Sequence, residues 1–154
     1  MSDPIELKRV DAVLTAVIRS RVQPSELSNF VPAACGEVWS FARSAGLPRP
    51  GRHVALYLDG GSVEAGAEVP ERFAGNDRVL CSQLPAGRVV TTTHFGPYAQ
   101  LGRTHAAIRE WCAEHGHRLS GVRWEIYGHW EASWDADPSK IQTDVFHLLE
   151  DPRG

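Results

Sequence analysis

The sequence predicts an α+β domain. We expect two βαββ units, related by a pseudo-twofold axis, to form one antiparallel sheet with both helices on one face and a central cleft. Three observations predict this fold. The length of 154 residues suits one domain, each half shows the order strand, helix, strand, strand, and a glycine and tyrosine spacing recurs. The domain should span residues 1–154, with repeats at roughly 10–75 and 79–150.

The repeat rests on two glycines and one tyrosine that have identical spacing in both halves. They are Gly46, Gly51 and Tyr57 in the first half and Gly116, Gly121 and Tyr127 in the second. Trp39 and Trp111 fall in the corresponding helices, within two residues of the same register. Chance can supply matching glycines, but the same order of elements around them favours a structural repeat.

The first half begins with an alternating apolar stretch that leads into an amphipathic helix. Apolar residues recur at helical spacing from Leu27 to Ala45, and Gly46 followed by prolines is typical of a helix end. Pro32 fits this helix only if it lies within the first turn. The strands expected here lie within Asp11–Val22, at His53–Asp59 and at Ser62–Val69, the last two joined by a turn at Gly60-Gly61.

The second half repeats this plan. A helix that ends at Gly116 is predicted by a largely apolar face with helical spacing. The residues of this face are Leu101, His105, Ile108, Cys112 and His115. The strands expected in this half are Val79–Leu84, Arg88–His94, Arg123–Trp130 and Thr143–Leu149. The connection from Glu131 to Gln142 contains two aspartates and a proline, and we expect a loop there.

The period of two in a strand assigns side chains to faces of the sheet. Glu125 shares a face with Tyr57 and Tyr127, whereas Val54, Leu56 and Leu58 share the opposite face with Trp124. The bulky aliphatic face is the better candidate for packing against the helices. We therefore expect Glu125 and both tyrosines to point away from the helices, where the sheet is left open or forms a groove.

Composition excludes several classes of function. A net charge of −3 without a basic cluster argues against nucleic-acid binding through this chain. Cys35, Cys81 and Cys112 form neither a disulfide framework nor a metal motif. No histidine pair has a familiar ligand spacing, and nucleotide and serine-nucleophile motifs are absent, so we expect no metal and no cofactor. Without a signal peptide or apolar span, we expect a soluble cytoplasmic protein that does not contact membranes.

Four segments resemble a known family. They are H-F-G-P-Y-A-Q-L at His94 to Leu101, W-C-A-E-H-G at Trp111 to Gly116, W-E-I-Y at Trp124 to Tyr127, and the closing D-V-F-H-L-L. Through them the sequence resembles the GyrI-like small-molecule-binding domain family, also called the effector-binding domain of AraC-type and MerR-type multidrug regulators. The resemblance is clearest from Arg88 to Leu149.

This resemblance implies two βαββ units around a cleft that accepts aromatic, often cationic compounds. It also implies that Glu125, on the strand after the second helix, is the partner of the cation. Two features depart from the family: Phe146-His147-Leu148 stands where an acidic residue and an I-P-type strand are common, and we expect no attached DNA-binding domain. The chain thus resembles stand-alone members, some of which hydrolyse cyclopropane-containing genotoxins with the pocket glutamate and a tyrosine.

A carboxylate between phenol rings suits a flat, cationic or strongly hydrogen-bonding ligand. The expected ligand-binding residues are Glu125, Tyr127, Tyr57, Trp39, Trp111, Trp130 and Trp134. Simpler interpretations stay open: Glu125 can be solvated or paired with Arg123 or Arg88, and the tyrosines and tryptophans can be ordinary packing residues. Three hypotheses follow: a module that senses or sequesters small molecules, a hydrolase that uses Glu125 and Tyr127, and a subunit whose cleft is filled by another chain.

Overall fold

The computed structural model describes residues 4–150, which form one eight-stranded sheet with two long helices. In chain order the elements are β1 (Glu6–Val10), β2 (Val13–Arg21), α1 (Leu27–Ser44), β3 (His53–Tyr57), β4 (Ser62–Glu68), β5 (Leu80–Leu84), β6 (Gly87–Phe95), α2 (Leu101–His115), β7 (Leu119–Tyr127), α3 (Ala132–Ala136) and β8 (Gln142–Leu149). All predicted helices and strands are present within a few residues, and β1 and α3 are additional.

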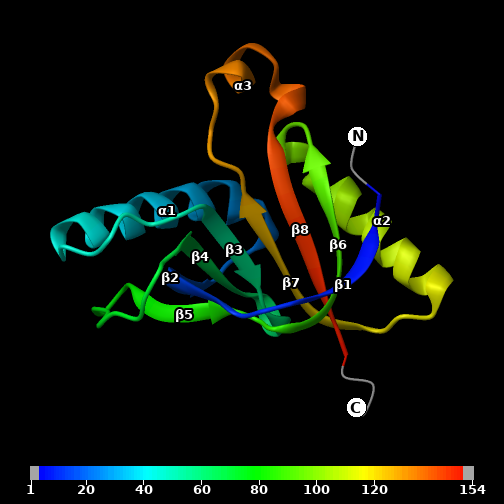
Figure 1. Cartoon of the computed structure of the whole chain (residues 1–154), viewed down its shortest axis with the longest axis horizontal. Coiled ribbons are helices and arrows are strands. Elements are labelled where there is room, and N and C mark those ends of the chain that lie inside the picture. The colour runs from blue at the N-terminus through cyan, green and yellow to red at the C-terminus, as the bar shows by residue number, and fades with distance from the viewer. Residues whose placement is uncertain (1–3, 151–154) are drawn as a thin grey trace.

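The strand order is β1-β6-β8-β7-β3-β4-β2-β5, and every neighbouring pair is antiparallel. This order is symmetric about the β7–β3 pair, so the two repeats are related by a pseudo-twofold axis as predicted. The helix α1 packs on β2, β3 and β4, and α2 packs on β6 and β8 (Figure 1). The predicted α+β class, with an antiparallel sheet and helices on one side, is confirmed.

The repeats exchange their first strands. β1 leads into β2 of the first repeat but pairs with β6 of the second, and β5 leads into β6 but pairs with β2. β1 escapes prediction because its sequence E-L-K-R-V is polar and exposed. Backbone hydrogen bonds to β6 hold this strand in place, and they do not require an alternating apolar pattern in its sequence.

The assignment of sheet faces from alternation is wrong. His105 of α2 hydrogen-bonds Glu125, so the face of Glu125, Tyr57 and Tyr127 is the face that carries the helices. Beneath α1 that face carries mainly small residues, Ala16, Ala65 and Ala67 among them. Small side chains allow a helix to approach the sheet closely, which explains why the bulky residues occupy the other side.

The opposite face is buried, whereas an open face or a groove was expected there. Its core consists of large side chains, namely Val54, Leu56, Leu84, Val89, Trp124, Ile126 and Phe146. Val10 and Val13, which flank the link between β1 and β2, pack against it. The exchanged edge strands therefore close this side, and the cleft lies between the helices.

Two local expectations also change. Pro32 lies beyond the first turn of α1, where its missing N–H leaves the carbonyl of Ser28 without an intrahelical donor. Both residues line the open side of the helix, and Ser28 is exposed, so solvent can satisfy that carbonyl. The segment 131–142, expected as a loop, contains the short helix α3, which projects beyond the ends of β7 and β8 (Figure 1). Within residues 4–150, no helix has the length and apolar character needed to cross a membrane.

Candidate ligand-binding cleft

A cleft of about 850 Å³ lies between α1 and α2, with the centre of the sheet as its floor. The α1 wall includes Leu27, Val31 and Trp39, and the α2 wall includes Leu101, His105 and Arg109. Tyr57, Glu125 and Tyr127 lie on the floor, and Tyr98 and Trp130, both exposed, stand near the opening. A largely apolar concave surface with a few convergent polar groups is the usual form of a small-molecule site.

Glu125 is the buried polar centre of this floor. The residue is only 4% exposed, and it pairs across the pseudo-twofold axis with Ala55, the equivalent residue of the first repeat. The hydroxyl of Tyr57 donates to Oε1 at 3.0 Å, and that of Tyr127 donates to the same oxygen at 2.5 Å. Nε2 of His105 lies 2.7 Å from Oε2. Three donors thus converge on one carboxylate.

These donors keep Glu125 ionised. Burial by itself raises the pKa of a carboxyl group, but hydrogen bonding and charge from His105, followed by the hydrogen bonds from Tyr127 and Tyr57, bring the pKa of Glu125 below its ordinary value. Burial and the nearby Glu125 charge raise the pKa of both tyrosines. The phenols therefore stay protonated and act as hydrogen-bond donors at neutral pH.

A second buried histidine continues the network. Nδ1 of His105 lies 2.8 Å from Nε2 of His147, which is 3% exposed. Burial lowers the pKa of His147 to about 3, so this ring is neutral at physiological pH. Nε2 of His105 is directed at the carboxylate and Nδ1 at the His147 ring, so a single proton between Nδ1 and the His147 Nε2 completes the hydrogen bond. The chain Glu125–His105–His147 is fully hydrogen-bonded in that arrangement.

Aromatic and cationic side chains surround the opening. The Arg123 guanidinium lies 5.1 Å from the ring centroid of Tyr57. The Tyr98 ring meets that of Tyr127 edge to face, with 5.5 Å between centroids. On the α1 side, Trp39 makes an edge contact with His53 at 5.8 Å. Stacking and cation–π attraction are thus both available to a bound ring system.

The structure brings together five of the seven residues expected from the sequence: Trp39, Tyr57, Glu125, Tyr127 and Trp130. Trp111 lies outside the cleft and stacks on His115 with 4.0 Å between ring centroids. Trp134 is the buried residue of the short helix α3 and lies outside the cleft lining. It reaches the cleft opening only through an edge contact with Trp130 at 5.3 Å.

Sequence reasoning missed His105, Arg109 and His147. His105 was visible on the apolar face of the second helix, where a histidine among leucine and isoleucine suggests only packing. Its partner His147 lies on β8, distant in the chain. The contact between His105 and His147 depends on the pairing of β8 with β7 in the sheet, which the sequence does not reveal. Arg109 belongs to the exposed turns of α2, and no spacing rule distinguishes it from other surface arginines.

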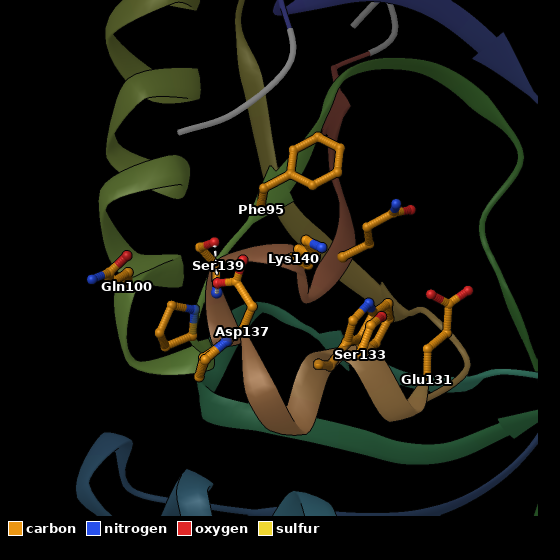
Figure 2. Close-up of a pocket in the computed structure, with 12 residues that line it drawn as sticks. Phe95, Gln100, Glu131, Ser133, Asp137, Ser139 and Lys140 are labelled. Carbon is orange, nitrogen blue, oxygen red and sulfur yellow. Dashed lines mark hydrogen bonds between the residues drawn. The ribbon is translucent and has the colours of Figure 1, made fainter.

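A second hollow of about 800 Å³ lies beside α3 and shares no lining residue with the cleft (Figure 2). Phe95 and Gln100 line it together with residues of the 131–142 segment. Asp137 accepts hydrogen bonds from the backbone N–H and hydroxyl of Ser139, which fixes the turn after α3. Within residues 4–150, no group of three or more His, Cys, Asp or Glu side chains is arranged so that it could hold a metal ion.

Comparison with known families gives one match over nearly the whole chain. A model described as the GyrI-like small molecule binding domain matches residues 3–147. No curated protein sequence matches this chain.

Similar solved structures share the fold at low sequence identity. The C-terminal domain of EcmrR has a TM-score of 0.73 at 21% identity, over 96% of this chain and 97% of that one. SAV2435 bound to tetraphenylphosphonium has a TM-score of 0.68 at 9% identity, over 96% and 94%. A hydrolase from Listeria innocua has a TM-score of 0.61 at 13% identity, over 95% and 91%. In the EcmrR–DNA complex, this chain spans only 57% of the longer EcmrR chain.

Proposed function

The chain belongs to the GyrI-like small-molecule-binding domain family, and from that premise we propose that it binds flat, lipophilic compounds, cations among them, in the cleft between α1 and α2. Such binding would serve sensing or sequestration. One observation carries the proposal: an ionised carboxylate, almost fully buried, sits at the floor of a wide aromatic cleft. A buried charge is costly, so its presence there favours a role in recognition.

Glu125 can serve a ligand although three side chains already donate to it. A carboxylate has about four lone-pair sites, and three donors leave one of them for an N–H or O–H group of the ligand. A cationic ring gains Coulomb attraction as well. The tetraphenylphosphonium bound to the structural neighbour SAV2435 supports this choice of ligand. We propose Trp39, Tyr57, Tyr127 and Trp130 as the stacking surfaces, and leave Trp111 and Trp134 out of the site.

The proposal is tested by titrating the protein with a panel of flat dyes, cationic and neutral, and with tetraphenylphosphonium. Quenching of tryptophan fluorescence reports binding, because Trp39 and Trp130 line the cleft. The proposal predicts saturable binding of several unrelated members of the panel at one site, with mutual competition. If no member of the panel binds, the proposal is wrong, and a cleft filled by another chain becomes the better account.

Hydrolysis is the second candidate function, favoured by the contact of Glu125 with two protonated phenols. In that reaction Glu125 would remove a proton from water, and the water oxygen would form a bond to an electrophilic carbon. The bond from that carbon to the leaving group would break, and the departing electron pair would be protonated by a tyrosine. The lowered pKa makes Glu125 a weak base, which favours binding over hydrolysis.

Mass spectrometry of an electrophilic cyclopropane or epoxide incubated with the protein distinguishes binding from hydrolysis, since hydrolysis adds one water to the compound.

A further inference from the structure

We propose that the ligand of this cleft carries an anionic group in addition to its aromatic ring system, and that Arg109 and Arg123 bind that group. The inference rests on the proposed function and specifies the chemical class of the ligand: an aromatic compound with a hydrogen-bond donor or cation for Glu125 and a carboxylate-like group for the arginines. Two guanidinium groups, those of Arg109 and Arg123, line the cleft together with the single carboxylate of Glu125.

The charges that line the cleft differ in sign from the charge of the protein as a whole. The full chain has a net charge of −3. Among the residues that line the cleft, Glu125 is the single carboxylate, whereas Arg109 and Arg123 both contribute a guanidinium. The lining therefore has a formal charge of +1 before any histidine is protonated. A purely cationic ligand would meet more positive than negative charge there.

Glu125 and the two arginines also differ in whether other side chains of the protein already compensate their charge. Glu125 has three donors within the protein, so its charge is compensated without a ligand. Within residues 4–150, neither Arg109 nor Arg123 forms an ion pair, whereas Arg19 is bound to the buried Glu64. Guanidinium groups bind carboxylates through paired, charge-assisted hydrogen bonds. The unpaired charges of this cleft are thus its arginines.

Both arginines line the same cleft, Arg123 half-buried on β7 and Arg109 exposed on α2. The Arg123 guanidinium lies over the ring of Tyr57, whose hydroxyl reaches Glu125. The positive charges of Arg123 and Arg109 both act on the buried His147, which lies next to Arg123 on the helix-covered face of the sheet. An anionic group between these arginines would therefore sit beside Glu125, within the span of one drug-sized ligand.

The repeat shows that the two walls have different chemistry. The spacing from the shared glycines places Arg109 at the position of Trp39, and Arg123 at the position of His53. Trp39 on α1 therefore has a basic counterpart in Arg109 on α2, and His53 on β3 has one in Arg123 on β7. A ligand that stacks its rings toward α1 would direct its anionic group toward α2. This polarity gives the ligand one orientation in a cleft that is otherwise nearly symmetric.

A matched pair of dyes tests the inference: a rhodamine with a free carboxylate, and the methyl ester of the same rhodamine. Both carry the same flat cationic ring system, and they differ in one negative charge. We expect the carboxylate dye to bind about tenfold more tightly, measured by fluorescence anisotropy. Arg109→Gln and Arg123→Gln, made separately, should each weaken binding of the carboxylate dye, whereas the cationic ester should lose no affinity. The ester also reports whether each variant keeps its cleft intact.

Arg103→Gln is the control, because Arg103 is exposed on the same helix, lies outside the cleft lining and changes the net charge equally. It should leave both affinities unchanged. Equal binding of the two dyes, or tighter binding of the ester, overturns the anionic group and leaves the proposed small-molecule function standing. Loss of affinity that Arg103→Gln reproduces also overturns it, as a general charge effect. Failure of both dyes to bind contradicts the proposed function itself.

Discussion

A carboxylate in the middle of a sheet stays ionised only if donors replace the water it has lost. Glu125 has these donors from three directions: Tyr57 on β3, Tyr127 on its own strand and His105 on α2. Burial alone raises the pKa of a carboxyl group, and the three donors together bring that of Glu125 below its ordinary value. The three side chains therefore explain how a strand that is otherwise aromatic and aliphatic tolerates a glutamate at its centre.

The lowered pKa of Glu125 predicts a pH-dependent contribution to stability. The folded protein holds the proton of Glu125 less tightly than the unfolded chain, whose ordinary pKa is 4.5. The contribution is therefore complete above that value and disappears as the pH falls through the lower pKa of the folded state. Urea unfolding should show the wild type to be more stable than Glu125→Gln at neutral pH, with the difference shrinking under acid conditions. A difference that is constant with pH would contradict an ionised Glu125.

His147 predicts a second loss of stability on acidification, which begins at a higher pH than that from Glu125. Its pKa is about 3 in the folded protein, against about 6.5 for an unfolded histidine. Between these values the unfolded chain binds a proton that the folded protein excludes, so the free energy of unfolding falls as the pH drops. The slope from this residue is roughly 1 kcal/mol per pH unit. His147→Gln should flatten the wild-type decline between about pH 6 and 5, whereas the exposed His115→Gln should not.

The sequence located part of this site correctly and for a physical reason. Alternation along a strand places Glu125 and Tyr127 on one face, and the repeat adds Tyr57 to it. The two histidines could not be assigned to the site from the sequence, because each occurs in a pattern typical of core residues. His105 lies on the apolar face of a helix, and His147 lies within an apolar strand. Only the three-dimensional pairing of α2 with β7 and β8 shows that they form one network with the glutamate.

At the scale of elements, helix ends were predictable because glycine marks them chemically. α2 ends at Gly116, which has φ of 73°, a left-handed conformation that residues with a Cβ adopt at a cost. The sheet faces were not predictable in the same way. Both faces of β3 and β7 are buried, so alternation separates two sets of residues without indicating which set meets the helices.

The same substitution at two glycines should have opposite effects. Gly36 lies inside α1 and Gly116 at the end of α2, and an added Cβ would contact nothing within 4 Å at either position. Gly36→Ala should raise the free energy of unfolding by about 0.5–1 kcal/mol, because alanine favours the helix. Gly116→Ala should lower it by about 1 kcal/mol, because of its positive φ. Thermal and urea unfolding of both variants measure the pair, and equal signs would contradict these backbone assignments.

At the scale of the whole molecule, duplication supplies the cleft and divergence supplies its chemistry. The repeats contribute one helix each to its walls and one strand each to its floor. The equivalent residues Ala55 and Glu125, which face each other across the axis, differ in charge, and only the second repeat carries the glutamate. A symmetric framework thus holds an asymmetric site.

The exchanged strands explain why the burial of the sheet face opposite the helices could not be predicted from the sequence. β1 and β5 are held by strands of the opposite repeat, and their crossing helps to bury the face that a linear reading leaves open. Long-range pairing of this kind leaves little local signal. The repeat predicted the order of elements within each unit, and the structure shows how the two units close on each other.

Whether Glu125 is the polar floor of a ligand cleft is decided by comparing ligand binding in three forms of the protein. Isothermal titration of a flat cationic dye is carried out with the wild type, with Glu125→Gln, and with Glu114→Gln as an exposed control on α2 outside the cleft. The account predicts that Glu125→Gln loses about 1–3 kcal/mol of binding free energy, while Glu114→Gln binds like the wild type. Unchanged affinity in Glu125→Gln would remove Glu125 from the site and contradict the claim.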